Sequence, residues 1–348
     1  MTSLWQAKTD EETRKVQFTG GSTYIISLPK SWISQNQVKK GSFIRFRQEE
    51  DGLLTIVPPI SVVQKKLEEA TIKVSANDDT EMITRKIVSA YLAGYSSILV
   101  KAEKQPLSSK QRHEMKSFVR KMLIGTEIVE DTPNRLILQV LLSFPELTVD
   151  SALRRMTVIT TSMHNDAVLG LKTNDIQLAK EVILTDNEVD RFDLYVTRQL
   201  RTAIQNPRVT KEIGLENGKD CLGYRIVTKL IERTADHAVN IAEDTLALKN
   251  RLSDKHIQNV EQMSNLSIKM FNAAMESLFK QDYNCAESII ESIREIVALE
   301  KEEIKAPELA CEDAANLRLI VESVKRTAEY ACDIAEIVLN LSVDSILE

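Results

Sequence analysis

The stretch ERTADHAVNIAED, Glu232 to Asp244, places acidic and polar side chains beside a stripe of small apolar ones. Glu232, Asp236, Asn240 and Glu243 fall at i, i+4, i+8 and i+11, so on a helix their side chains lie within an arc of roughly 80°. The stretch therefore predicts an amphipathic helix that presents a row of acids next to its packing face.

The same pattern returns nearer the end of the chain. In RTAEYACDIAE, Arg326 to Glu336, the acids Glu329, Asp333 and Glu336 stand at the equivalent places. From about Thr148 onward glycine and proline become rare, and apolar residues recur at helical spacing through six segments. The six predicted helices are Ser151–Lys172, Asp175–Gln205, Asp220–Asn250, Asp254–Lys280, Asp282–Lys305 and Pro307–Val343.

Long helices with short connections form antiparallel bundles. The two acid-rich copies are the third and the sixth predicted helix, which indicates a tandem repeat of a three-helix unit. We therefore expect a mainly α protein with one three-helix bundle at residues 148–250 and a second at 251–348.

The first part of the chain reads differently. Residues 14–58 alternate as short strands around the turns Gly20-Gly21-Ser22 and Asp51-Gly52, and only the segment KSWISQN is expected to be helical. A domain at residues 1–58 is too small to bury much apolar surface alone, so we expect an interdigitated dimer to complete its core. Residues 60–147 alternate strand, helix, strand, helix and hairpin, which indicates a small α/β unit without an evident role.

Composition places the protein among soluble ones. The chain has 348 residues, 43% of them hydrophobic, and four scattered cysteines without a CxxC motif. No apolar leader and no run of about twenty apolar residues occurs, so a reducing, cytoplasmic protein that is not embedded in a membrane is expected. Net charge is −6, yet between Arg14 and Arg47 seven Lys and Arg occur with no acid. This basic N-terminal segment is expected to bind anions.

The acids suggest a metal site. Asp186, Asp190 and Asp193 share one face of the second predicted helix by i, i+4, i+7 spacing. If this face lies beside Glu232, Asp236 and Glu243, the clustered carboxylates raise one another's pKa unless a cation lies between them. Oxygen ligands suit hard divalent or trivalent ions, so Mg, Mn, Fe or Zn are the candidates.

Two alternatives stay open. Acids at i, i+4 on an amphipathic helix are commonly a solvated surface that holds nothing. The second bundle is the weaker candidate, because Lys325 replaces Glu232 and Ile293 and Val297 replace Asp186 and Asp190. Its remaining candidate ligands are Glu329, Asp333 and Glu336, with Glu300 nearby.

These residues carry a family resemblance. AKEVILTDNEVDRFD followed by ERTADHAVNIAED resembles the PhoU family of phosphate-signalling proteins. The resemblance covers about residues 150–343. It implies two tandem three-helix bundles whose ExxxD-type motifs hold multinuclear metal clusters.

The N-terminal segment RKVQFTGGSTYIISLPKSW, with VKKGSFIRFR and DGLLTIVP after it, is similar to the AbrB/MazE swapped-hairpin DNA-binding domains. The combination with PhoU bundles resembles archaeal phosphate-uptake regulators. By that resemblance five basic residues contact DNA: Arg14, Lys15, Lys30, Lys39 and Lys40. The basic residue usual after the first turn in that family is replaced here by Ser22-Thr23.

Three functions compete. The leading hypothesis is a dimeric, DNA-binding regulator of phosphate uptake and homeostasis with metal-binding bundles. The second is a protein-interaction module that restrains a phosphate ABC transporter or a sensor kinase, with the N-terminal domain serving only dimerisation. The third, a two-metal hydrolase, is disfavoured since the sequence has no nucleophile motif, phosphate-cradling glycine loop or HExxH, so we expect no enzyme.

Overall fold

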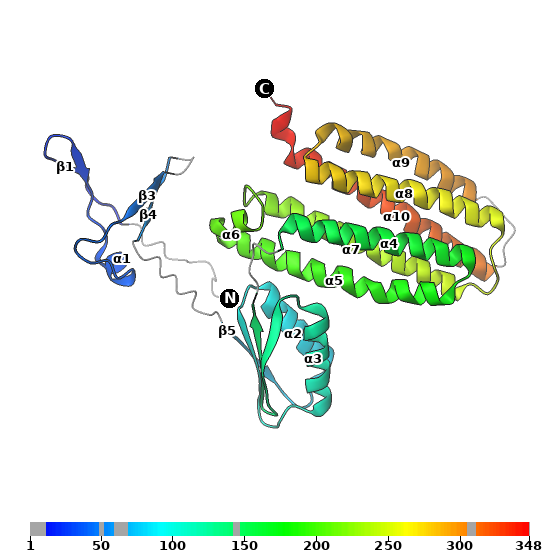
Figure 1. Cartoon of the computed structure of the whole chain (residues 1–348), viewed down its shortest axis with the longest axis horizontal. Helices are drawn as coiled ribbons and strands as arrows, with labels where there is room; N and C mark the ends of the chain where they lie inside the picture. The colour runs from blue at the N-terminus through cyan, green and yellow to red at the C-terminus, as the bar shows by residue number, and fades with distance from the viewer. Residues whose placement is uncertain (1–11, 49–51, 59–68, 142–146, 305–310, 348) are drawn as a thin grey trace, which may run out of the picture. The chain divides into compact units, whose positions relative to one another are not determined.

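The protein, seen in a computed structural model, divides into two compact units, residues 1–68 and 69–348. The structure describes residues 12–48, 52–58, 69–141, 147–304 and 311–347 (Figure 1). The expected start of the last helix at Pro307 therefore lies outside the described residues.

The first unit consists of two hairpins and one short helix. Strand β1 (Gln17–Thr19) pairs antiparallel with β2 (Thr23–Ile25), and β3 (Arg45–Gln48) pairs antiparallel with β4 (Leu54–Val57), with α1 (Lys30–Gln35) between the hairpins. The predicted hairpins and the predicted KSWISQN helix are confirmed. No residue that the structure describes in this unit is buried, and Phe43 and Tyr24 are 89% and 74% exposed.

The second unit begins with an α/β domain. Its four-stranded sheet has the order β5-β6-β8-β7, in which only β5 and β6 run parallel. Helices α2 and α3 lie side by side over one face of this sheet (Figure 1) and enclose a core with the inward residues of the strands. The elements are β5 (Glu69–Val74), α2 (Thr80–Leu92), β6 (Ser97–Ala102), α3 (Ser109–Met122), β7 (Thr126–Asp131) and β8 (Arg135–Val140).

The rest of the second unit is helical. Each set of three consecutive long helices forms one bundle, as predicted, and the first bundle consists of α4, α5 and α7 while the second consists of α8, α9 and α10 (Figure 1). Their bounds are α4 (Val149–Thr173), α5 (Ile176–Gln205), α7 (Asp220–Ala247), α8 (Asp254–Lys280), α9 (Tyr283–Ile304) and α10 (Cys311–Leu341). A short helix, α6 (Pro207–Glu212), lies in the predicted break before α7, and a 3-10 turn, Val343–Ser345, follows α10.

Local sequence explains the helix ends. Asn174 and Gln281 end α4 and α8 with φ of 55° and 53°, the left-handed conformation that a helix C-terminus favours. The Ser253 hydroxyl accepts a hydrogen bond from the His256 N–H and caps the start of α8, as its position predicted.

The two bundles share one hydrophobic core. At their contact the imidazole of His164 (α4) is fully buried, with Nδ1 3.1 Å from Ser264 Oγ (α8) and Nε2 3.2 Å from Thr327 Oγ1 (α10). Burial lowers the pKa of His164 to about 4, so the ring is neutral at neutral pH. Helix α7 also approaches α10 closely, since a Cβ added at Gly223 would lie 3.1 Å from a methyl group of Ile337.

Helix α5 also joins the first bundle to the α/β domain. The buried guanidinium of Arg198 donates to the carbonyl oxygens of Tyr91, Gly94 and Tyr95, the last two at 3.1 and 2.9 Å. These carbonyls belong to the C-terminal end of α2, where a cation is favourable for the helix dipole. Arg198 therefore holds α5 against the α/β domain.

Candidate functional site: two rows of acids

The first acid row lies where α5 packs against α7. Asp186, Asp190 and Asp193 come from α5, and Glu232 and Asp236 come from α7. Each of the five side chains is half-buried. The structure thus brings together five of the six acids that the sequence predicted for this bundle.

Burial and the proximity of like charges raise the pKa values of the acids in this row. Burial raises the pKa of Asp186 to about 7, with further increases from the charges of Asp190, Asp236 and Glu232. Burial likewise raises the pKa of Asp190 to about 6, aided by Glu232 and Asp236. The pKa of Asp193 and that of Asp236 are also raised, mainly by burial. The raised pKa values mean that the row favours binding of a proton or a cation.

Two basic side chains that the sequence analysis did not consider offset part of this charge. Lys229, one turn before Glu232, forms an ion pair with it. Arg225 Nη1 lies 3.2 Å from Asp193 Oδ1. Asp186, Asp190 and Asp236 form no ion pair with any residue in the described ranges, and Asp186 Oδ1 is buried without a hydrogen-bond partner there.

The sixth predicted acid lies apart from these interactions. Glu243 is exposed, and its charge acts on the adjacent Asp244, whose pKa burial and Glu243 raise to about 6. His237 of α7 lies at the contact with α10, with Nε2 3.4 Å from the hydroxyl of Tyr330.

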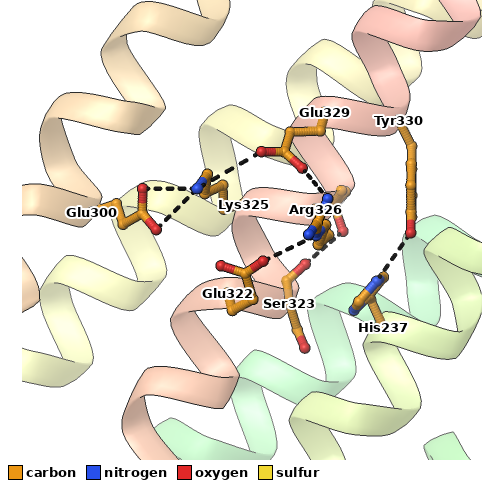
Figure 2. A network of polar contacts seen from close by, with 9 residues as sticks. His237, Glu300, Glu322, Ser323, Lys325, Arg326, Glu329 and Tyr330 are labelled. Atoms are coloured by element: carbon orange, nitrogen blue, oxygen red, sulfur yellow. Dashed lines mark hydrogen bonds and ion pairs between the residues drawn. The ribbon is translucent and has the colours of Figure 1, made fainter.

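The second acid row, on α10, contains its own cations (Figure 2). Lys325 Nζ lies 3.1 Å from Glu300 and 3.7 Å from Glu329. Arg326 lies 2.8 Å from Glu329 and 2.9 Å from Glu322. Glu300, Glu322 and Glu329 therefore each have a basic partner.

The rest of the second row is more exposed. Burial raises the pKa of Asp333, and Glu336 and Glu329 raise it further, whereas Arg233 and Arg326 lower it. Asp333 and Glu336 both lie on the surface. The predicted ligands Glu329, Asp333 and Glu336 thus share a face of α10, but Glu329 is already neutralised by the chain.

The donor chemistry of the first row fits a hard cation. All of its donors are carboxylate oxygens, and the unpartnered Asp186 Oδ1 is the kind of buried acceptor that a cation would satisfy. Across the described ranges, however, no three or more His, Cys, Asp and Glu side chains already converge as a metal site requires. Asp186, Asp190, Asp236 and Glu232 would have to turn toward a common point, and Lys229 would have to leave Glu232.

The predicted DNA contacts lie on the surface of the first unit. Lys15, Lys30, Lys39 and Lys40 are exposed and form no ion pair within the described part of the chain, whereas Arg14 pairs with Glu12. Lys30 begins α1, and Lys39 and Lys40 follow it before β3. No helix in the described residues is long and apolar enough to cross a membrane.

Comparison with known proteins fits this architecture. The family described as PhoU domain matches residues 153–245 and 260–338, which correspond to the two bundles. The family described as antidote-toxin recognition MazE, bacterial antitoxin, matches residues 17–64. The fold and the repeated acid motif thus define a tandem three-helix-bundle protein with a MazE-like N-terminal domain. By its helical region the chain belongs to the PhoU family.

Individual relatives extend the comparison. The phosphate-specific transport system accessory protein PhoU homolog of Aquifex aeolicus is 28% identical over 139 residues, which are 39% of this chain and 60% of that protein's length. The crystal structure of PhoU from Pseudomonas aeruginosa has a TM-score of 0.50 at 20% identity, covering 56% of this chain and 96% of that one. PhoU from Streptococcus pneumoniae has a TM-score of 0.48 at 19% identity, over 57% and 96%.

Proposed function

We propose that this chain is a dimeric regulator of phosphate transport that binds DNA through its N-terminal unit and a hard metal ion through the first acid row. The observation that carries the proposal is the pair of half-buried acids Asp186 and Asp190, whose pKa values are raised to about 7 and about 6 within a row that has too few cations. Membership of the PhoU family and the name of the Aquifex relative support the link to phosphate transport.

A bound metal ion would balance the negative charge of the acids that have no basic partner. Mn, Fe, Mg or Zn held by Asp186, Asp190, Glu232 and Asp236, with Asp193 beside them, would supply positive charge that couples the facing sides of α5 and α7. Helices α5 and α7 already hold these acids on facing sides, so binding would require the side chains to turn toward the ion and Lys229 to leave Glu232. A change of cation occupancy would then alter the surface that the bundle presents to a partner such as a transporter or a sensor kinase.

Thermal melting tests the metal site. With Mn or Fe at a hundredfold excess over Kd, the native protein should gain about 2.7 kcal/mol of stability. Asp236→Asn should lose most of that gain while remaining as stable as the native protein without metal, because the substitution relieves repulsion. Glu329→Gln, the equivalent position of the second row, is the matched control and should keep the full metal response. Equal metal-induced shifts in all three proteins would exclude Asp236 from the site.

The N-terminal unit supports the DNA and dimer proposals. It has no buried residue among those described, and large apolar side chains such as Phe43 (89%), Tyr24 (74%) and Phe18 (58%) are exposed. A second copy of the unit packed on these side chains would bury them, and the dimer would then carry two sets of Lys15, Lys30, Lys39 and Lys40. That doubled basic surface suits the phosphate backbone of DNA.

The alternative, an interaction module whose N-terminal unit only dimerises, gives a different salt dependence. If the basic residues contact phosphates, log affinity for DNA falls steeply with log salt, and Arg14→Ala with Lys15→Ala reduces the slope by roughly one per lost contact. Lys104→Ala with Lys180→Ala removes the same charge from exposed positions of the second unit and should leave the slope unchanged. The absence of a salt-dependent DNA affinity in the native protein would favour the interaction module, and an equal slope in both double variants would exclude Arg14 and Lys15 as phosphate contacts.

A further inference from the structure

A cavity of about 260 Å³ lies where the α/β domain meets α5. Arg191 is contributed by α5, Arg120 by the last turn of α3, and Thr126 by the first position of β7. The cavity belongs to neither acid row and lies outside the N-terminal unit.

Two buried polar atoms of the lining residues have no hydrogen-bond partner among the described residues. They are the hydroxyl oxygen of Thr126, a residue only 7% exposed, and Nε of Arg191. Within the described part of the chain Arg191 is engaged through Nη1, which lies 3.3 and 3.4 Å from the two carboxylate oxygens of Glu188. A guanidinium nitrogen can only donate, so its missing partner is a hydrogen-bond acceptor. A buried donor left without one destabilises the fold.

The charges around the cavity favour an anion as that acceptor. Arg120 forms no ion pair with any described residue, and it also lines an adjacent cavity together with His113, Lys116, Ser117 and Lys121. The helix dipole of α3 also stabilises a positive charge in its last turn, so Arg120 by itself does not require a bound anion. Glu127 is the one acid that lines the cavity in the described residues, and its side chain is exposed.

We propose that this cavity is a binding site for a small tetrahedral oxyanion, either inorganic phosphate or the phosphoryl group of a small phosphate monoester. Arg191 and Arg120 supply charge-assisted donors, and the Thr126 hydroxyl supplies a third donor. At about 260 Å³ the cavity is smaller than the usual pocket for a larger organic ligand, which suits a compact anion. The site goes beyond the proposed function, because it requires neither DNA binding nor a metal ion.

Isothermal titration calorimetry on the full-length, chelator-treated protein tests the site with inorganic phosphate, sulfate and glycerol 3-phosphate. Native protein should bind a phosphate probe, and Arg191→Gln and Thr126→Val should each weaken binding tenfold or more because each removes a donor. Lys121→Gln removes a neighbouring positive charge that does not line the cavity, and it should change Kd by less than about threefold. Tighter binding of free phosphate than of the ester identifies phosphate as the ligand, and the reverse identifies a monoester.

Two further variants keep the test decisive if Thr126→Val folds poorly. Thr126→Ser retains the hydroxyl and should retain the native Kd. Glu127→Gln removes the opposing carboxylate at an exposed position and should tighten binding severalfold. No binding at millimolar phosphate, or binding that Arg191→Gln and Glu127→Gln leave unchanged, overturns the proposal. Asp236→Asn should bind phosphate normally, so a failure of the metal proposal does not affect this result.

Discussion

The helices α7 and α10 carry corresponding acid motifs, but the basic residues that pair with these acids differ between the two helices. Position by position, Glu232 of α7 corresponds to Lys325 of α10, and Asp236 corresponds to Glu329. The second row is neutralised within the chain, since Lys325 pairs with both Glu300 and Glu329. The first row has acids at both places, and only Glu232 of the two pairs with a lysine.

This difference shows that the repeated motif alone does not define a cation site. The rows differ in how many acids have a basic partner: in the described residues Asp186, Asp190 and Asp236 have none, whereas Glu300, Glu322 and Glu329 each pair with Lys325 or Arg326. In the second bundle the residues that correspond to Asp186 and Asp190 are Ile293 and Val297, so the facing helix also contributes fewer acids. We expect the acid row of the first bundle to bind a metal ion and that of the second bundle to bind none.

The largest effect should come from making the first row resemble the second. Glu232→Lys places a fixed positive charge among Asp186, Asp190 and Asp236, and a metal ion then has less to neutralise. The metal-induced gain of about 2.7 kcal/mol at a hundredfold excess over Kd should disappear, as measured by thermal melting with and without Mn. A full metal response in this variant would mean that the ion binds elsewhere.

The reverse exchange should have a somewhat smaller effect. Lys325→Glu removes the ion pairs to Glu300 and Glu329 and leaves like charges in contact, which should lower metal-free stability by about 1–2 kcal/mol. Part of this loss should be recovered with Mn in chemical unfolding experiments. Lys325→Gln is the control, because it removes the ion pairs without adding an acid and should show little recovery. Equal recovery in the two variants would contradict the proposed role of the acid.

The pH dependence of stability should separate the rows more finely. The folded-state pKa of Asp186 is about 7 and that of Asp190 about 6, above their ordinary values, so the folded state binds protons more tightly than the unfolded state. Without metal, this contribution to stability rises as pH falls from about 8 to 6.5. Asp186→Asn should flatten the rise in urea unfolding measured at several pH values. An unchanged slope would assign the protons to other groups.

At lower pH a buried histidine acts in the opposite direction. The pKa of His164 is lowered to about 4 in the fold, so its contribution to stability is complete above its unfolded value of about 6.5 and is lost as pH falls toward 4. The test of the acid row is therefore cleanest above pH 6.5.

The smallest expected effects are two changes in metal-free stability that have opposite signs in the two rows. Asp190→Asn should raise metal-free stability by about 0.5 kcal/mol, because repulsion is relieved, whereas Glu329→Gln should lower it by a similar amount, because ion pairs to Lys325 and Arg326 are lost. Both substitutions remove one negative charge from a half-buried position. Changes of the same sign in parallel melts would show that the two rows do not differ as described.

Local patterns in the sequence predicted much of the fold. Apolar periodicity located the long helices, and Ser253 marked the start of α8 because capping depends on neighbouring residues. The i, i+4 spacing also placed Asp186 and Asp190 on one face of α5. The short helix α6 was not predicted, because it lies in a segment rich in turn-forming residues, PRVTKE followed by IGLENGK.

Contacts between distant segments could not be predicted in the same way. Arg225 pairs with Asp193 only because α7 packs beside α5, and nothing in the spacing of the acids indicates that partner. The pairing of Lys229 with Glu232 could have been predicted from the sequence, since the two residues stand at i and i+3 on one helix. The cavity that joins Thr126 to Arg191 depends on how the α/β domain docks on α5, and no local motif marks it.

The single core of the two bundles has a thermodynamic consequence. Each repeat is recognisable in sequence as a separate unit, but its apolar face is completed by the other repeat, and the His164 imidazole takes its hydrogen-bond partners, Ser264 and Thr327, from the other bundle. Opening one bundle would expose the interior of its neighbour. We therefore expect the helical region to melt cooperatively as one body, with a calorimetric enthalpy equal to the van't Hoff value for that transition. A charge gained or lost on α7 thus changes the melting of α10 as well.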